Sequence, residues 1–296
     1  MRLSEEPYSR EDKRLLASVA TQAGGALENI RLAEQMAERI ENERRLAQEM
    51  EFAKQVQARL FPQKFPSLQT LEYAGGCIQA RKVGGDYYDF LELQPGRLGL
   101  VLADVVGKGV SGALLMANLQ ANLRSQYAMA VNDLGRLLES VNRLFCENTT
   151  DSSFATLFFA DYDDFTRRLR YVNCGHLPAL LLRAPQASPG EADESRAVER
   201  LESTSTVLGL FDDWHCDVAE VKRAPGDTLV LYSDGASEAA RTDREEFGVS
   251  RLIDTMRAHC RFPPAALLEA IVEAVRDFSP GEQQDDITLV VARCTA

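Results

Sequence analysis

One run of about fifty residues restricts the fold of this chain more than any other feature. Residues 11–60 read as helix almost without interruption, and apolar or small residues recur in alternating steps of three and four: Leu16, Val19, Ala23, Ala26, Ile30, Ala33, Ala37 and Ile40. This spacing is the a/d pattern of a heptad, and it predicts a long helix whose narrow apolar seam pairs with a second copy of the chain. A single amphipathic helix packed on its own domain is the alternative.

The heptad register shifts by one residue after the polar run 41–45. Leu46 stands where the first seam would place Ala47, and the new seam continues through Leu46, Met50, Ala53, Gln57 and Leu60. Such a discontinuity changes supercoiling locally, so we expect this point to transmit rotation or bending. Pro62 and Pro66 end the helix, because proline disfavours helical backbone at the residue before it.

After Pro66 the sequence changes to short apolar or alternating runs bounded by turns. These runs predict strands at residues 73–80, 87–93, 98–105, 154–162, 167–173, 179–182, 217–221, 228–233 and 287–292. Helices are expected at 110–129, 134–147, 249–258 and 264–278, and a surface excursion at 184–200. Because strands and helices come in consecutive groups, the pattern favours an α+β fold with antiparallel sheets over a doubly wound one.

Charge and composition limit the partners. The chain has 45 acidic and 33 basic residues and a formal net charge of −12, which argues against nucleic acid. A phosphorylated substrate stays compatible if bound cations invert the local field. We expect no membrane span and no secretory signal, since no apolar run approaches the roughly 20 residues that cross a bilayer. Six scattered cysteines predict a reducing, cytoplasmic compartment, and three histidines without ligand spacing argue against zinc.

Four separated aspartates share one context, in which an apolar run meets a glycine-bearing or polar turn. They lie in VGGDYYDF (Asp86), GLVLADVVGKG (Asp104), TLVLYSDGASE (Asp234) and QQDDITLVV (Asp285, beside Asp286). A carboxylate at the end of a buried strand is partly desolvated and costly to keep charged without a partner. The nearby basic residues are too few to pair with all of them: Arg81, Lys82 and Lys108. Hard divalent cations with oxygen ligands, Mg²⁺ or Mn²⁺, are the natural compensation.

Each of these motifs also has a purely structural interpretation. Asp234 with Gly235 is a common turn dipeptide, and Asp104 could cap the helix expected from residue 110. The Gly84–Gly85 pair could form only a tight turn, and Asp285–Asp286 could begin an exposed strand. The residues by themselves therefore leave the metal site and the structural roles both open.

Several motifs together resemble those of bacterial PPM-type serine/threonine phosphatases of the RsbU/SpoIIE branch. VGGDYYDF, ADVVGKGVSGALLMA, NCGHLPALLL, LVLYSDGASEA and DDITLVV stand in the order and approximate spacing of that family, over residues 52–292. The resemblance implies an antiparallel β-sandwich flanked by helices, with a dinuclear Mn²⁺ or Mg²⁺ centre at one edge. Residues 15–36 resemble the last helix of a GAF sensor domain, most of which would then lie outside this chain.

The same resemblance divides the chain into residues 1–64, a sensor-derived helix and switch-helix linker, and residues 65–296, the phosphatase domain. It implies that Asp104 bridges two metals and that Asp86 and the Val105 carbonyl bind one of them. Asp234 and Asp285 would hold the other. Asp285 is preferred to Asp286 because the first acidic residue of the D-[DN]-x-[ST] motif is the family ligand.

Secondary candidates are less defined. Asp89 would reach a metal-bound water or serve as a turn residue, and Arg81 or Lys82 would bind substrate phosphate or remain solvated. Eukaryotic relatives carry a histidine acid shortly after the bridging aspartate, where this chain has Val106–Lys108. For His176, in the NCGH motif, a structural bond to the backbone is preferred to an acid role.

The expected function is a cytoplasmic protein phosphatase that hydrolyses phosphoserine or phosphothreonine with a metal-activated water. The resemblance suggests a phosphorylated anti-sigma-factor antagonist of STAS-type fold as substrate, and a homodimer through residues 11–60 as the regulatory element. The alternatives are a dimetal phosphomonoesterase for small molecules and a signalling scaffold that does not catalyse.

Overall fold

The computed structural model describes residues 8–127, 133–150, 152–185, 196–242 and 244–295. The chain divides into two compact units, residues 1–52 and 53–296. The division at residue 64 expected from the sequence stays a prediction. Within the described residues no helix combines the length and the apolar character needed to span a bilayer.

A single long helix, α1 (Arg10–Ala58), passes through residues 41–45 without interruption. Ser9 and Asp12 cap its start reciprocally, since the Asp12 N–H donates to Ser9 Oγ at 3.1 Å and the Ser9 N–H donates to Asp12 Oδ2 at 3.0 Å. In the first unit its apolar residues are exposed, among them Leu16, Val19, Ile30, Met36 and Ile40. The long helix predicted from the sequence is confirmed, and its pairing with a second copy stays a prediction.

The second unit contains two antiparallel five-stranded sheets. One sheet has the order β1 (Leu71–Ile78), β10 (Ile287–Cys294), β9 (Thr228–Tyr232), β6 (Ala179–Leu182) and β7 (Val198–Leu201). The other has the order β2 (Asp86–Gln94), β3 (Arg97–Val105), β4 (Ala155–Asp163), β5 (Arg168–Cys174) and β8 (Ala219–Lys222).

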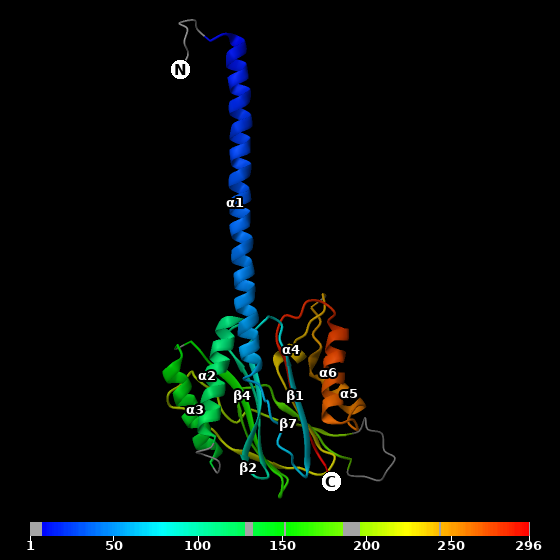
Figure 1. Cartoon of the computed structure of the whole chain (residues 1–296). Coiled ribbons are helices and arrows are strands. Elements are labelled where there is room, and N and C mark those ends of the chain that lie inside the picture. The colour runs from blue at the N-terminus through cyan, green and yellow to red at the C-terminus, as the bar shows by residue number, and fades with distance from the viewer. Residues whose placement is uncertain (1–7, 128–132, 151, 186–195, 243, 296) are drawn as a thin grey trace. The chain divides into compact units, whose positions relative to one another are not determined.

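Successive side chains of a strand point to opposite faces, and they show that the two sheets pack face to face with helices on the outer face of each. On β3, Leu100 and Leu102 point into the core between the sheets, while Val101 points into a second core with the helices α2 (Val110–Gln126) and α3 (Leu134–Asn148). On β9, Leu231 joins the central core and Val230 the third, outer core. Helices of that third core are α4 (Asp234–Ser237), α5 (Gly248–Ala258) and α6 (Pro264–Phe278). Figure 1 shows α2 and α3 on one side of the strands, and α5 and α6 on the other.

The predicted fold class is therefore confirmed, as are the predicted strands and helices to within a few residues. One element was wrong: the excursion expected at 184–200 ends in β7, which pairs antiparallel with β6 from Leu182↔Val198 to Ala179↔Leu201. The remainder of that excursion, at 186–195, and the end of the helix expected at 110–129 lie outside the described residues.

Candidate metal centre

Asp86 and Asp104 are direct partners across the β2–β3 ladder. Asp86 is only 3% exposed, and its Oδ2 has no hydrogen-bond partner. Burial, and then the neighbouring Asp104 charge, raise the pKa of Asp86 well above its ordinary value. An unpartnered carboxylate oxygen in such a place is costly unless a cation or a proton compensates it.

Asp234 and Asp285 adjoin strands of the other sheet. Asp234 is the first residue of α4, shortly after β9 ends, and Asp285 lies two residues before β10, the strand that pairs with β9. Burial, and then the charges of Asp234, Asp285 and Asp286, raise the pKa of Asp104 to about 7. The fold thus gathers all four aspartates singled out in the sequence, with Asp104 in electrostatic contact with both halves of the group.

The neighbouring carboxylates Asp285 and Asp286 have different surroundings. Asp286 is 5% exposed, and its Oδ1 accepts a hydrogen bond from the Ala80 N–H at 2.8 Å. Its carboxylate also accepts backbone N–H groups of Gly85 and Asp86, so it holds the loop that carries Asp86. The Asp285 side chain is 40% exposed and its Oδ2 lies 2.5 Å from Lys108 Nζ. This geometry favours Asp285 as the ligand and Asp286 as its structural neighbour.

Glycines allow these loops to approach one another. A Cβ on Gly84 would overlap the Asp286 carboxylate, and a Cβ on Gly85 would lie 3.0 Å from the Val105 carbonyl oxygen. A Cβ on Gly235 would overlap the backbone of Asp286. The Val105 carbonyl, predicted as a ligand, therefore faces the same loop that carries Asp86.

Lys108 lies beside the group and is bonded to one of its members. Its ammonium contacts Asp285, and Lys108 lines both the small cavity beside Asp86 and Asp104 and the larger pocket beside Asp234. In the described part of the chain, no three His, Cys, Asp or Glu side chains converge closely enough to enclose an ion. The four aspartates are thus neighbouring carboxylates rather than a closed coordination shell.

The residues nevertheless fit a hard divalent cation. Every candidate donor is an oxygen, and the buried Asp86 Oδ2 lacks a partner. Burial, and then the charge of Asp285, also raise the pKa of Asp234, so a cation would relieve repulsion on both sides of the group. Carboxylate and carbonyl oxygens suit Mg²⁺ or Mn²⁺ better than zinc.

Of the two basic secondary candidates, only Arg81 lies beside Asp86 and Asp104. Arg81 lines the cavity beside Asp86 and Asp104, whereas Lys82 is exposed and does not line it. Asp89 lies apart from the group: it is fully buried, and Arg124 donates to both of its oxygens at 2.8 Å. Tyr87 Oη also donates to Asp89, at 2.5 Å. Asp89 is three residues from Asp86 along β2, so the two side chains point to opposite faces.

His176 connects the two sheets close to Asp104. Its Nε2 lies 3.2 Å from the Tyr232 carbonyl oxygen on β9, and its Nδ1 lies 2.8 Å from Thr156 Oγ1 on β4, where Thr156 pairs with Asp104. A carbonyl only accepts, so Nε2 carries the proton and Nδ1 accepts from the hydroxyl. Burial lowers the pKa of His176 to about 4, which keeps the imidazole neutral. This geometry favours the structural role.

We expect His176→Gln to reduce the pH dependence of stability. Unfolded histidine binds a proton near pH 6.5, whereas folded His176 stays neutral until about pH 4, so its stabilisation is present above pH 6.5 and lost as the pH falls towards 4. The loss is on the order of 3 kcal/mol, and glutamine, which can donate and accept in the same way, does not titrate. Urea unfolding at pH 7 and pH 4.5 measures the free energy of unfolding of both proteins. If wild type and variant differ in this free energy by the same amount at both pH values, the prediction is contradicted.

Gln57 is a site residue that the sequence did not reveal. It is the buried residue of α1, where its Nε2 donates to the Gly84 carbonyl at 2.8 Å and its Oε1 accepts from the Gly84 N–H at 3.1 Å. Gln79 Nε2 donates to the same Oε1 at 2.7 Å. The last turn of α1 is thereby bonded to the loop that positions Asp86. Its seam position in the heptad gave no sign of this contact.

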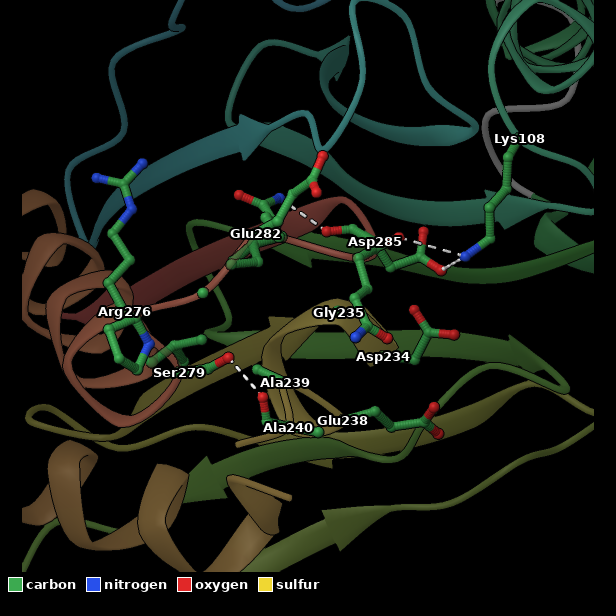
Figure 2. A pocket seen from close by; sticks show the side chains of 16 residues that line it. Lys108, Asp234, Gly235, Glu238, Ala239, Ala240, Arg276, Ser279, Glu282 and Asp285 are labelled. Atoms are coloured by element: carbon green, nitrogen blue, oxygen red, sulfur yellow. Dashed lines mark hydrogen bonds and ion pairs between the residues drawn. The ribbon is translucent and has the colours of Figure 1, made fainter. Parts of the chain in front are cut away.

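A pocket of about 500 Å³ adjoins Asp234 and Asp285. Its walls come from the 234–240 segment, the end of α6 and the loop before β10, and they include Ala239, Val275 and Ile287. Figure 2 shows Lys108 and Arg276 at opposite ends of this pocket, with Asp234, Glu238 and Asp285 toward the Lys108 end.

Comparison with known proteins gives consistent matches. A family model described as Stage II sporulation protein E (SpoIIE) matches residues 94–295. "Phosphoserine phosphatase RsbU" of Bacillus subtilis (strain 168) is 26% identical over 245 residues, which make up 83% of this chain and 70% of that protein. The solved RsbU and RsbW domains of Rv1364c from Mycobacterium tuberculosis are 28% identical, with a TM-score of 0.66; the match covers 78% of this chain and 62% of that one.

Two further structures share the fold. The SiaA-PP2C domain of Pseudomonas aeruginosa has a TM-score of 0.73 at 22% identity, over 85% of this chain and 98% of that domain. The catalytic domain of the serine/threonine protein phosphatase PstP, solved with 2 manganese ions, has a TM-score of 0.56 at 16% identity, over 77% of this chain and 99% of that one. The PP2C-like fold predicted from the sequence is confirmed, and a protein of that fold binds manganese.

Proposed function

The chain belongs to the SpoIIE family, and we propose that it is a metal-dependent serine/threonine phosphatase that acts on a phosphorylated protein. The observation that carries this proposal is the Asp86–Asp104 pair, in which Asp86 is buried and has an unpartnered oxygen, beside Asp234 and Asp285. The named activity of the relative RsbU, phosphoserine phosphatase, supports the same reaction.

We assign the residues as follows. Asp104 would bridge two Mn²⁺ or Mg²⁺ ions, Asp86 and the Val105 carbonyl would hold one, and Asp234 and Asp285 the other. Two such ions supply an acidified water and stabilise the charge on the phosphoryl oxygens. Because the cation sites would use the carboxylates, Arg81 at the cavity wall would bind the substrate phosphate.

We further propose that the substrate is a phosphorylated anti-sigma-factor antagonist with a STAS-type fold. The similarity to RsbU, and to a structure that contains RsbU and RsbW domains, supports a partner of this class. We also propose a cytoplasmic location, because the six cysteines at positions 77, 146, 174, 216, 260 and 294 are all free thiols.

The activity is tested with cation-free protein and two substrates, a phosphoserine protein of STAS-type fold and p-nitrophenyl phosphate. Hydrolysis should require Mn²⁺ or Mg²⁺, and kcat/KM should be higher for the phosphoprotein. A higher kcat/KM for the ester would favour a small-molecule phosphomonoesterase. Failure to hydrolyse either substrate with cations present would favour a non-catalytic scaffold.

The exposed apolar residues of α1 support a dimer through residues 11–60. We expect Ile30→Asp to weaken dimerisation by roughly tenfold or more, because it places a charge in an apolar seam. Sedimentation of the variant measures this, with Glu28→Gln as a control at an exposed position of the same helix. An unchanged dimer fraction in Ile30→Asp would contradict this arrangement.

A further inference from the structure

The pocket beside Asp234 and Asp285 extends well beyond what a phosphoryl group requires. It has a volume of about 500 Å³ and includes apolar surface from Ala239, Val275 and Ile287. Since Asp234 and Asp285 form part of its wall, anything that occupies the pocket lies next to the proposed metal centre. Because the pocket adjoins the site of the reaction, the occupant that fits it is the peptide segment on one side of the phosphorylated residue.

The charge of the pocket wall is mainly negative. Four carboxylates line it, those of Asp234, Glu238, Glu282 and Asp285, against two cationic side chains, those of Lys108 and Arg276. Lys108 is already paired with Asp285. A divalent cation at Asp234 and Asp285 would neutralise these two carboxylates, so the carboxylates that remain in the wall are those of Glu238 and Glu282.

Glu238 has a fixed place in this wall. Its N–H donates to the Asp234 carbonyl at 2.7 Å, at the end of α4, so its backbone position follows that of Asp234. Burial, and then the charges of Asp234, Glu246 and Asp285, raise the pKa of Glu238 above its ordinary value. Among the described residues no cationic side chain forms an ion pair with it, and of the two cations that line the pocket, Lys108 is paired with Asp285.

We propose that Glu238 selects substrates that carry a basic side chain close to the phosphorylated residue, with that side chain bound in the pocket beside Asp234 and Asp285. This inference rests on the proposed phosphatase function and adds a preference to it. An unpaired carboxylate at the wall of a partly apolar pocket attracts an arginine or lysine and repels a glutamate or aspartate. Substrates that carry an acidic side chain at this position are therefore disfavoured.

The test uses synthetic phosphoserine peptides that place one arginine, or one glutamate, at each position within three residues of the phosphoserine. At one or more of these positions, wild type should show a higher kcat/KM for the arginine peptide. In Glu238→Gln the ratio of arginine to glutamate peptide should fall by roughly two- to fivefold, the range of an exposed ion pair. Glu238→Lys should reverse the preference.

Two controls separate this inference from the proposed function. Glu269→Gln, at an exposed position of α6 outside the pocket wall, should keep the wild-type ratio. Hydrolysis of p-nitrophenyl phosphate, which has no flanking residues, measures any general loss of activity in Glu238→Gln, and the peptide rates are compared relative to it. If wild type hydrolyses the peptides without any charge preference, or if Glu238→Gln keeps the wild-type ratio, the role of Glu238 is refuted while the phosphatase stands. If wild type hydrolyses no substrate, the proposed function itself fails.

Discussion

Asp104→Asn should reduce cation-dependent hydrolysis by at least about 100-fold, because even residues that only support metal ligands change affinity or activity by 10- to 100-fold. Asp104 is the aspartate whose pKa responds to both Asp234 and Asp285, and it pairs directly with Asp86. Asparagine keeps the shape of the side chain and removes the charge that we assign to the bridging position.

The loss should not come from unfolding. The pKa of Asp104 is raised to about 7 by burial and by neighbouring carboxylates, so its charge destabilises the cation-free protein at pH 8. The variant should therefore unfold at a temperature no lower than wild type in the presence of a chelator. Calorimetric titration with Mn²⁺ and kcat/KM on a phosphoserine peptide measure the effect, with the exposed Asp277→Asn as the matched control. Retention of Mn²⁺-dependent activity in Asp104→Asn would show that the assignment is wrong.

The second large effect is expected for Gln57→Ala. Removing this side chain leaves the buried N–H and C=O groups of Gly84 without partners, at a cost of roughly 1 to 3 kcal/mol each. Because Gly84 stands two residues before Asp86, the loop that positions Asp86 should loosen, and cation affinity and activity should fall by about 10- to 100-fold.

The matched control is Gln63→Ala. Gln63 is also a glutamine bonded to backbone carbonyls, those of Ala58 and Phe61, but it is exposed. Thermal unfolding and Mn²⁺ titration of both variants distinguish a specific effect on the Asp86 loop from a general one. Equal cation affinity in Gln57→Ala and wild type would refute the connection.

Much of the fold could be predicted because its signals are local. The central strands are short, largely apolar runs bounded by turns, such as β3, and such runs are visible without any tertiary information. The four aspartates could be found for the same reason, since each lies at, or within two residues of, the end of such a strand. By contrast, β7 is only four residues long and half of them are charged, and it becomes a strand only by pairing with β6.

The residues that were missed or misplaced depend on long-range contacts. Gln57 bonds to a residue 27 positions away, and a glutamine in a heptad gives no local sign of such a partner. Asp89 stands in the same motif as Asp86, yet strand alternation turns it to Arg124 on the other face of the sheet. The choice between Asp285 and Asp286 likewise depends on which loop each carboxylate contacts.

The division of the aspartates between the sheets has a consequence for folding. Asp86 and Asp104 belong to one sheet, whereas Asp234 and Asp285 adjoin strands of the other. Cations held between them would join the two sheets much as a covalent cross-link does, and binding to the native state alone would add to the free energy of unfolding. The concentration of divalent cation would then set the stability of the sandwich as well as its activity.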